Sequence, residues 1–359
     1  ESRCYVFDAD EIEVLEAATA ELHQMALNAA QQVVATERFE QFGIPPAWHD
    51  VVRRSWQAHL EGQPSAFSLM GRMDLAYDGG GPPKLLEYNA DTPTACLEAS
   101  VAQWHWLEAM RPQLERGADQ FNSIHEQLIE RWRVYRQASH LPEGAPLHFA
   151  AVLDSAEDWG NVDYLRDCAT QAGWATVPIA VERIGLRGRQ FVDEDNAPIE
   201  RLFKLYPWEW LVREEFSEAL RQSNVNMIEP AWKMLLSNKA LLVVLWELYP
   251  GHPNLLPADF NQHAVGPRYV RKPKLAREGA NVLLVDGDLR FETEGPYADA
   301  SSPADPFVYQ ALAPVARMGA DTMVVGSWVI GDQPAGLGLR EDSSPVTCNT
   351  SRFVPHYFL

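Results

Sequence analysis

The chain is short of basic residues and has neither closely spaced cysteines nor a long apolar run. Its 30 lysines and arginines face 50 aspartates and glutamates, which gives a formal net charge of −20. Because binding to a nucleic-acid backbone needs clustered basic side chains, we expect no nucleic-acid partner. No uncharged stretch approaches the roughly 18 apolar residues of a membrane span, and the residues shown begin without an apolar signal core. We therefore expect no membrane partner and a cytoplasmic location.

The four cysteines lie far apart, without a C-x-x-C pair, at Cys4, Cys96, Cys168 and Cys348. This spacing favours neither a disulfide framework nor a zinc site. Cys96 with His105 as nucleophile and base is a less favoured alternative, because closeness in sequence does not place two side chains together. The sequence has no evident internal repeat, and its short β-α-β pattern carries no G-x-G-x-x-G, so dinucleotide binding has no support there.

The length of 359 residues allows roughly two or three domains of ~150 residues, and a hydrophobic content of 46% is ample for buried cores. A proline- and glycine-containing segment at 142–146 indicates a linker. We expect an N-terminal part of helices and one hairpin over 1–145, a small β-α-β unit over 146–205, and a third part over 206–359.

Apolar residues recur at helical spacing in four segments, which we expect to be helices: 10–38, 46–60, 94–136 and 232–249. Ser237 or Asn238 is expected to interrupt or cap the last of these helices. On the long third helix, Glu98, Glu108 and Glu115 are expected on the solvated side.

Short apolar runs around one helix predict a β-α-β unit from three segments: 147–154, 163–173 and 175–181. Residues 184–205 are predicted to form a hairpin with its tip at 193–196. A tryptophan-rich segment at 206–211 is interpreted mainly as core packing. Glycine and proline turns separate the strands expected in the last third: 268–274, 280–285, 290–294, 307–311, 322–330 and 335–341.

The segment 71–94 predicts a β-hairpin with its turn at the Gly-Gly-Gly-Pro-Pro of 79–83. Side chains two apart on a strand point the same way, so one face carries four polar groups: Arg72, Asp74, Glu87 and Asn89. With the tip at the glycines, Asp74 lies opposite Glu87, and Arg72 lies opposite Asn89. Oxygen donors of this kind suit Mg²⁺ that bridges to phosphates. A solvated face with ordinary cross-strand ion pairs is the alternative.

A second candidate is the basic segment 269–281, predicted as a strand that leads into a glycine-containing loop. Lys272 can contact phosphates as a point charge, and the backbone near Gly279 can approach a phosphate because glycine lacks Cβ. The alternative is a loop whose basic side chains are simply exposed to solvent.

Taken together, these motifs resemble the glutathionylspermidine synthetase family of ATP-grasp carboxylate–amine ligases. The resemblance covers most of the chain, in the synthetase domain without the amidase domain, and rests on motifs in a fixed order: Arg72-x-Asp74, Leu86-Glu-Tyr-Asn-Ala-Asp-Thr92, Leu236-Ser-Asn-Lys-Ala240, Tyr269-Val-Arg-Lys-Pro273 with Arg277 and Gly279, Val308-Tyr-Gln-Ala311, Gly326-Ser-Trp-Val-Ile330 and Gly336-Leu-Gly-Leu-Arg340. It implies an α+β fold that is ATP-grasp-like with a permuted order, a small pre-ATP-grasp-like β-α-β unit, and N-terminal helices.

The resemblance also implies ATP and Mg²⁺ as cofactors and an amide bond made through an acyl phosphate, with release of ADP and phosphate. The implied metal ligands are Asp74, Glu87 and Asn89. The implied nucleotide residues are Lys239, Lys272, Arg277, Gly279 and Gln310, with Gln310 near the adenine. Arg72 and Arg340 are implied at the reacting centre, and Thr92 and Thr94 in the acyl pocket. A non-catalytic ATP-binding member of the family and a phosphotransferase are the alternative functions.

Three positions depart from the pattern expected of members that join glutathione to spermidine. Arg352 stands where an acidic residue is expected, Leu205 where a polar one is, and Ala95 where a cysteine is. A guanidinium near the amine site favours an anionic amine over a polyamine. We therefore expect Arg352 to contact the amine substrate, and a peptide or amino acid as the acyl donor. The substrates are small-molecule or peptide carboxylates and amines, and the oligomeric state stays open.

Overall fold

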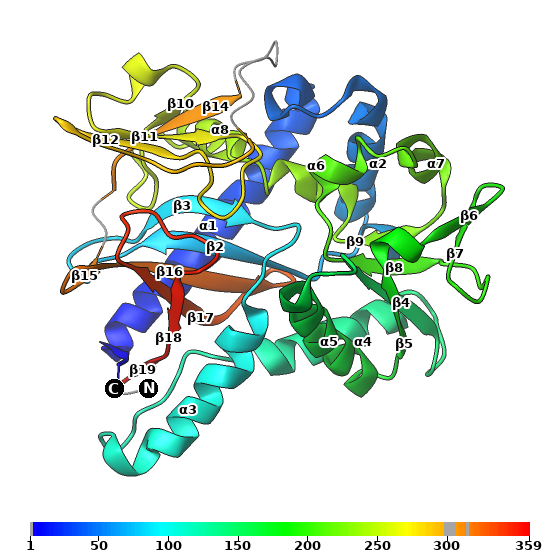
Figure 1. Ribbon diagram of the computed structural model, residues 1–359, viewed down its shortest axis with the longest axis horizontal. Helices are drawn as coiled ribbons and strands as arrows, with labels where there is room; N and C mark the ends of the chain where they lie inside the picture. The colour runs from blue at the N-terminus through cyan, green and yellow to red at the C-terminus, as the bar shows by residue number, and fades with distance from the viewer. Residues whose placement is uncertain (1–2, 298–305, 314–315) are drawn as a thin grey trace.

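The computed structural model describes residues 3–297, 306–313 and 316–359, and within them a sheet of six antiparallel strands lies at the centre (Figure 1). Its strand order is β18-β17-β16-β2-β3, with β15 paired to β16. The strands are β2 (Met70–Ala76), β3 (Lys84–Asn89), β15 (Arg317–Met318), β16 (Asp321–Ile330), β17 (Gln333–Asp342) and β18 (Arg352–Val354). The predicted hairpin is therefore confirmed as β2 and β3, and it joins strands from the far end of the chain.

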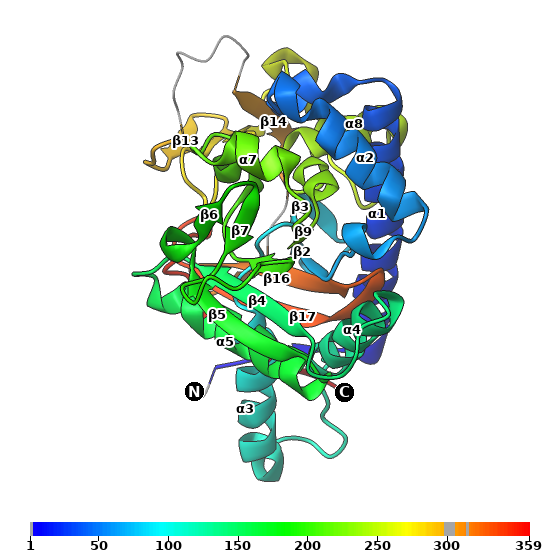
Figure 2. The ribbon, with the colours of Figure 1, turned by 90° about the vertical axis from the view of Figure 1, so that its right-hand side faces the viewer.

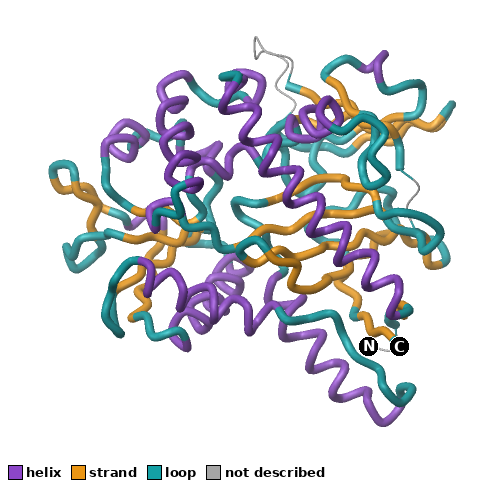
Figure 3. The backbone as a smooth tube through the Cα atoms, turned by 180° about the vertical axis from the view of Figure 1, so that it is seen from behind, coloured by secondary structure: helices purple, strands orange, loops and turns teal. Residues whose placement is uncertain are grey.

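The first helix, α1 (Ala9–Ala35), crosses one face of this central sheet (Figure 3). It begins after Asp8, whose backbone N–H donates to the Glu11 carboxylate at 2.9 Å. Apolar residues at helical spacing, such as Leu15 and Leu22, are fully buried against the sheet and the neighbouring helices. The helix thereby closes the back of the central sheet and leaves its other face to the site.

A second antiparallel sheet lies beside the first in the order β10-β14-β11-β12-β13. Its strands are β10 (Ala258–Asp259), β14 (Phe307–Ala311), β11 (Tyr269–Pro273), β12 (Leu283–Asp286) and β13 (Leu289–Glu292). Helix α8 (Ala240–Leu248) packs against this sheet and against α1. The predicted interruption is confirmed: a 3₁₀ segment, η7 (Ala231–Leu235), comes first, and Asn238 Oδ1 then accepts the Ala240 N–H at 2.9 Å.

A third sheet is parallel, in the order β5-β4-β8-β9, with α4 and α5 against it (Figure 2). Its parts are β4 (Pro146–Ala151), α5 (Ala156–Gln171), β5 (Ala175–Ala180), β8 (Arg201–Lys204) and β9 (Asn226–Ile228), with α4 (Ile124–Ala138) packed beside α5. The predicted β-α-β unit is confirmed, and β9 joins it from beyond residue 205.

The hairpin predicted over 184–205 is wrong in its extent. The hairpin pairs β6 (Gly185–Arg187) with β7 (Gln190–Val192) and turns at Gly188, whose φ is +66°. Strand β8 instead runs parallel to β4, because its apolar residues Leu202 and Phe203 are buried in the sheet's core.

The single helix predicted over 94–136 is also wrong. A π-helical turn, η4 (Glu98–Ala102), leads into α3 (Gln103–Met110), which projects away from the sheets, and a short η5 (Arg111–Gln113) follows before α4 (Figure 2). Pro112 has no N–H to continue the helical ladder, and Gly117 takes a φ of +102° that a helix does not allow. These two residues divide the segment.

The two ends of the described chain pair in parallel as β1 (Tyr5–Phe7) and β19 (His356–Phe358) (Figure 1). The remaining elements are η1 (Arg38–Phe42), η2 (Pro46–Trp48), α2 (His49–Leu60), η3 (Pro64–Ala66), η6 (Val181–Arg183), α6 (Trp208–Leu211), α7 (Ser217–Gln222) and η8 (Gln262–Ala264). Among the helices of the described ranges, none combines the length and apolar character needed to cross a membrane.

Candidate active site

A cavity of about 350 Å³ lies between the central sheet, the five-stranded sheet and the parallel-sheet unit. It gathers most of the residues that the sequence singled out: Arg72, Asp74, Glu87, Asn89, Thr92, Thr94, Lys239, Lys272, Arg277, Gly279 and Arg340. Gln310 and Arg352 are the two expected residues that do not line it. Segments some two hundred residues apart in sequence thus meet around one space.

The hairpin places its polar face on this cavity in the predicted register. Arg72 pairs with Asn89 and Asp74 pairs with Glu87 across the strands, and a register shift follows Asp74. Arg72 is 7% exposed and Asp74 is 5% exposed, because β2 is an inner strand between β16 and β3. The alternative of a solvated hairpin face is therefore wrong for these two side chains.

Asp74 is held between two arginines from different strands. Its Oδ1 accepts from Arg72 Nε at 2.7 Å, and its Oδ2 accepts from Arg340 Nη2 at 2.5 Å. Burial disfavours the charged carboxylate, but Arg340 and Arg72 outweigh burial and lower the pKa of Asp74 to about 2. Arg72 also donates to the Thr94 carbonyl at 2.7 Å, which links the hairpin to the loop beyond it.

Glu87 faces the lysine that precedes α8. Lys239 Nζ lies 3.0 Å from Glu87 Oε2 and donates to the Ala276 carbonyl at 2.7 Å. Burial opposes ionisation of Glu87, yet the charge of Lys239 lowers the pKa of this carboxyl below its usual value. Both hairpin carboxyls are therefore ionised at neutral pH.

Lys272 enters the cavity from β11 with Gln310 behind it. Its ammonium donates to Gln310 Oε1 and to the Leu86 carbonyl, each at 2.8 Å. Burial lowers the pKa of Lys272 to about 8, although the negative charge of Glu87 acts to raise it. Gln310 is 2% exposed and donates to the Leu85 carbonyl at 2.8 Å. Gln310 thus fixes Lys272 from behind the cavity wall, and its side chain does not line the cavity where the adenine was expected.

The balance of charge at this end of the cavity is positive. Four cations surround the two hairpin carboxylates: Arg72, Lys239, Lys272 and Arg340. In a chain whose net charge is −20, this concentration of cations favours an anionic ligand.

The donor set suits a hard divalent cation that shares its coordination with such a ligand. Asp74 and Glu87 supply carboxylate oxygens, and Asn89 supplies an amide that is hydrogen-bonded to the Thr92 backbone at 3.2 Å. In the described ranges, no cluster of three or more His, Cys, Asp or Glu side chains could enclose a metal alone. Mg²⁺ fits the set, because it is commonly held by one or two carboxylates and completes its shell with phosphate oxygens and water.

The loop over 275–281 spans the cavity and is not merely exposed to solvent. Arg277 donates to Glu209 Oε1 at 2.9 and 2.7 Å and to Thr92 Oγ1 at 2.5 Å. Gly279 has a φ of +68°, and a Cβ there would lie 2.4 Å from the Thr347 carbonyl oxygen. Only glycine fits this close approach.

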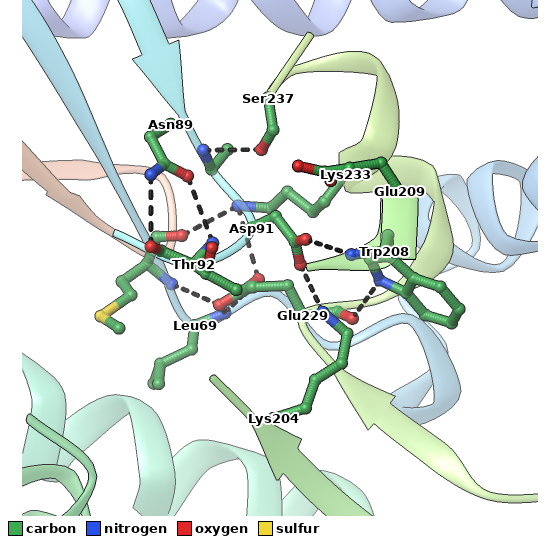
Figure 4. A network of polar contacts seen from close by, with 12 residues as sticks. Leu69, Asn89, Asp91, Thr92, Lys204, Trp208, Glu209, Glu229, Lys233 and Ser237 are labelled. Atoms are coloured by element: carbon green, nitrogen blue, oxygen red, sulfur yellow. Dashed lines mark hydrogen bonds and ion pairs between the residues drawn. The ribbon is translucent and has the colours of Figure 1, made fainter. Parts of the chain in front are cut away.

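Behind Thr92, a buried polar network fixes the loop that follows β3 (Figure 4). Asp91 accepts from Lys204 Nζ at 2.5 Å and from the Trp208 backbone N–H at 2.8 Å. Glu229 accepts the Leu69 backbone N–H at 3.0 Å, next to Lys233. The network joins the hairpin loop to β8, to α6 and to the residue that follows β9, so polar contacts from three segments hold this side of the site.

The other end of the cavity is acidic, which the sequence analysis missed. Five carboxylates line it: Glu98, Glu157, Asp158, Glu209 and Glu278. Glu98 was expected on a solvated helix face, but its Oε2 is buried and has no hydrogen-bond partner among the described residues.

A topological signal was available for two of these acids. Glu157 and Asp158 start α5, after the carboxyl end of parallel strand β4, where ligands bind in open α/β sheets. Glu209 lay hidden in the tryptophan-rich segment. There Trp208 is buried as expected, while Trp210 is 37% exposed and lines the cavity.

Arg352 is not brought to the site. Its side chain is 59% exposed, and it pairs with Asp321 at 2.7 Å and Glu341 at 3.0 Å. Side chains alternate along an extended chain, so Phe353 on β18 and Ser351 just before this strand line the cavity, while Arg352 between them faces away from it. The structure therefore removes the reason for expecting an anionic amine.

The alternative nucleophile and base are not supported. Cys96 is fully buried, and burial raises the pKa of its thiol well above the usual value. His105 is exposed on α3. A buried neutral thiol is a poor nucleophile.

The fold and the cavity define a mixed α/β protein with a deep, cation-rich site that is acidic at its far end. The whole chain, residues 1–359, matches the family described as glutathionylspermidine synthase, preATP-grasp. The chain belongs to this family, and the predicted resemblance is confirmed.

Similar proteins with curated names are ligases and synthetases. A Haemophilus influenzae protein that is named as an acid–amine ligase is 43% identical over 99% of this chain and 89% of its own length. The trypanothione synthetase of Crithidia fasciculata is 25% identical over 93% of this chain and 53% of its own length. The bifunctional glutathionylspermidine synthetase/amidase of Escherichia coli is 26% identical over 94% of this chain and 56% of its own length. The chain thus spans about half the length of the latter two, and its family is one of acid–amine ligases.

Among solved structures, the fold is similar to a glutathione synthetase-like effector from Globodera pallida. The TM-score is 0.61 at 10% identity, over 99% of this chain and 89% of that chain. At this identity the likeness supports the mixed α/β fold alone.

Proposed function

We propose that the chain is an ATP-dependent acid–amine ligase, which forms an amide bond through an acyl phosphate and releases ADP and phosphate. The observation that carries this proposal is the pair Asp74 and Glu87 on one face of a buried hairpin, with four cations around it. The fold is ATP-grasp-like in this proposal, with the hairpin preceding the nucleotide lysines in sequence. Membership of a family of acid–amine ligases supports the reaction class.

The residues divide the work along the cavity. Lys239 and Lys272 hold nucleotide phosphates, and Asp74, Glu87 and Asn89 hold the metal. When bound, Mg²⁺ neutralises phosphate charge during transfer. No protein nucleophile is needed, because positioning and electrostatic stabilisation supply most of the catalysis in phosphoryl transfer.

The acyl donor binds with its carboxylate toward the two arginines at Asp74. Arg72 and Arg340 stabilise the negative charge of the phosphoryl group in flight and of the acyl phosphate. Thr92 and Thr94 lie at the turn beside them and line the donor's pocket. A peptide or amino acid carboxylate remains the proposed donor.

The amine enters from the acidic end. The carboxylates of Glu98, Glu157 and Asp158 favour a cationic amine there, which reverses the expectation drawn from Arg352. An amine must lose a proton before it attacks, and a carboxylate on this wall can accept it.

The test is ADP release by the full chain over a panel of carboxylate and amine pairs, followed by the mass of each product. Ligation predicts a product equal to both substrates less one water, formed only with Mg-ATP. A product that gains phosphate would indicate a phosphotransferase. Nucleotide binding without ADP release across the panel would favour a non-catalytic member of the family.

A further inference from the structure

Arg277 reaches across the cavity and is held by two groups on the opposite side. Its Nε and Nη2 both donate to Glu209 Oε1, at 2.9 and 2.7 Å, and its Nη1 donates to Thr92 Oγ1 at 2.5 Å. The Glu209 side chain is 13% exposed and that of Arg277 is 19% exposed, so solvent screens the pair weakly. The loop over 275–281 is thereby fastened to α6.

The contact with Glu209 uses the part of the guanidinium that an anionic ligand needs. Arginine binds carboxylates and phosphates best through two parallel N–H groups, and the Nε–Nη2 edge of Arg277 is already on Glu209. A phosphate can take this edge only if Glu209 gives it up.

Glu209 is itself fixed, so its charge can be changed without moving its segment. The preceding residue, Trp208, donates its backbone N–H to Asp91, which is buried against Lys204 (Figure 4). The Trp208 indole also donates to the Glu229 carbonyl at 2.9 Å. The Glu209 backbone does not depend on the Arg277 contact for its place.

We propose that Glu209 is the resident counter-ion of Arg277, and that phosphate of the bound nucleotide or of the acyl phosphate replaces it on the Nε–Nη2 edge. This inference rests on the proposed nucleotide site. The exchange leaves the Glu209 carboxylate unpaired on the acidic wall, where it attracts a cationic amine. Glu209 acts through Arg277 and is therefore a positioning residue.

The experiment compares Mg-ATP affinity by calorimetry in the wild-type chain, Glu209→Gln and the control Glu214→Gln. Glu214 lies on the same segment, is exposed, and bonds the Tyr206 hydroxyl instead of Arg277. We expect Glu209→Gln to bind roughly 3- to 10-fold more tightly than the wild type, because no ion pair is broken on binding, and Glu214→Gln to be unchanged. If Glu209 only held Arg277 and the loop in place, Glu209→Gln would instead bind Mg-ATP more weakly than the wild type.

A double-variant cycle distinguishes displacement of Glu209 from Arg277 from the general effect of removing one negative charge from the cavity. In an Arg277→Gln background, adding Glu209→Gln should no longer change the affinity. Glu209→Ala replaces Glu209→Gln if the latter fails to fold, with the same expected direction. Unchanged or weaker Mg-ATP binding in Glu209→Gln, or in Glu209→Ala where that variant replaces it, overturns the exchange. The same gain with and without Arg277 also overturns it. Absence of binding by the wild type would instead overturn the proposed function.

Discussion

At the scale of residues, burial shifts the pKa values of the acidic and basic side chains in the cavity. Neighbouring charges oppose this shift more strongly at Asp74 than at Lys272. Two guanidiniums outweigh burial at Asp74 and keep its pKa at about 2, while at Lys272 burial dominates and lowers the pKa to about 8. The carboxylate is therefore charged at every physiological pH. The lysine is charged below about pH 8 and neutral above it in the ligand-free chain.

This pKa predicts how nucleotide affinity depends on pH. Phosphate binding needs the Lys272 ammonium, so above the ligand-free pKa of about 8 each binding event must take up a proton. We expect the Kd of Mg-ATP to rise by up to about tenfold per pH unit above that point, in line with one pKa unit being 1.36 kcal/mol. Calorimetric titrations between pH 7 and 9.5 measure it. Lys272→Met should bind weakly and without this slope; a slope that survives in the variant would assign the proton to another group.

The residues of the hairpin could be placed from the sequence because a glycine-rich turn fixes register, and register fixes the face. Asp74 and Glu87 pair as predicted. Arg352 could not be placed in the same way. It lies on a strand at the edge of the sheet, and which face of such a strand meets the cavity depends on tertiary packing, not on the local sequence. Glu209 was hidden for a related reason, since α6 owes its place to the distant Asp91.

At the scale of elements, the loop over 275–281 connects the two sides of the site. Lys239 holds the Ala276 carbonyl, Arg277 holds α6, and Gly279 packs against Thr347. Three contacts with three different segments make the position of the loop sensitive to a single added methyl group.

The change Gly279→Ala should displace this loop, with Gly287→Ala as its matched control. Both glycines have positive φ, +68° and +62°, so both variants carry a backbone strain of roughly 1–2 kcal/mol. Only at Gly279 does the new Cβ also meet the Thr347 carbonyl and Val346, whereas nothing lies within 4 Å at Gly287. Trypsin cleavage after Arg277 should quicken several-fold in Gly279→Ala alone, and Mg-ATP should bind more weakly. Equal cleavage of both variants would mean that the close approach does not hold the loop.

The strands of the last third could be predicted because glycine and proline turns separate them. The long helix over 94–136 could not, since its apolar spacing continues through the segment that Pro112 and Gly117 divide. The parallel pairing of β8 with β4 depends on long-range packing that buries Phe203. The local alternation of polar and apolar residues in this segment predicted only a hairpin.

At the scale of the whole molecule, a buried ion pair joins the parallel-sheet unit to the loop that follows the central hairpin. Lys204 on β8 meets Asp91 beyond β3, and both are 1% exposed. Replacing both charged residues with apolar ones of similar volume would change the free energy of unfolding little. Removing only one of them leaves the other charge without a partner in the interior, which is strongly destabilising.

A double-variant cycle on this pair tests that account of stability. Lys204→Met leaves the Asp91 carboxylate with the Trp208 N–H alone, and we expect it to lower the free energy of unfolding by about 3–5 kcal/mol. Adding Asp91→Asn removes the orphaned charge and should restore most of the loss. Urea unfolding of the four proteins measures it. Additive losses would show that the two charges do not depend on each other.

The central claim is that the cation-rich cavity binds Mg-ATP, and thermal unfolding of the full chain with and without Mg-ATP tests it most directly. A ligand at 100 times its Kd adds about 2.7 kcal/mol to the stability of the folded chain. We expect a stabilisation of this size for the wild type, reduced when EDTA removes Mg²⁺ and reduced in Glu87→Gln, whose carboxylate lies on the cavity wall. No change in unfolding temperature at millimolar Mg-ATP, or the same change in Glu87→Gln as in the wild type, would contradict the account.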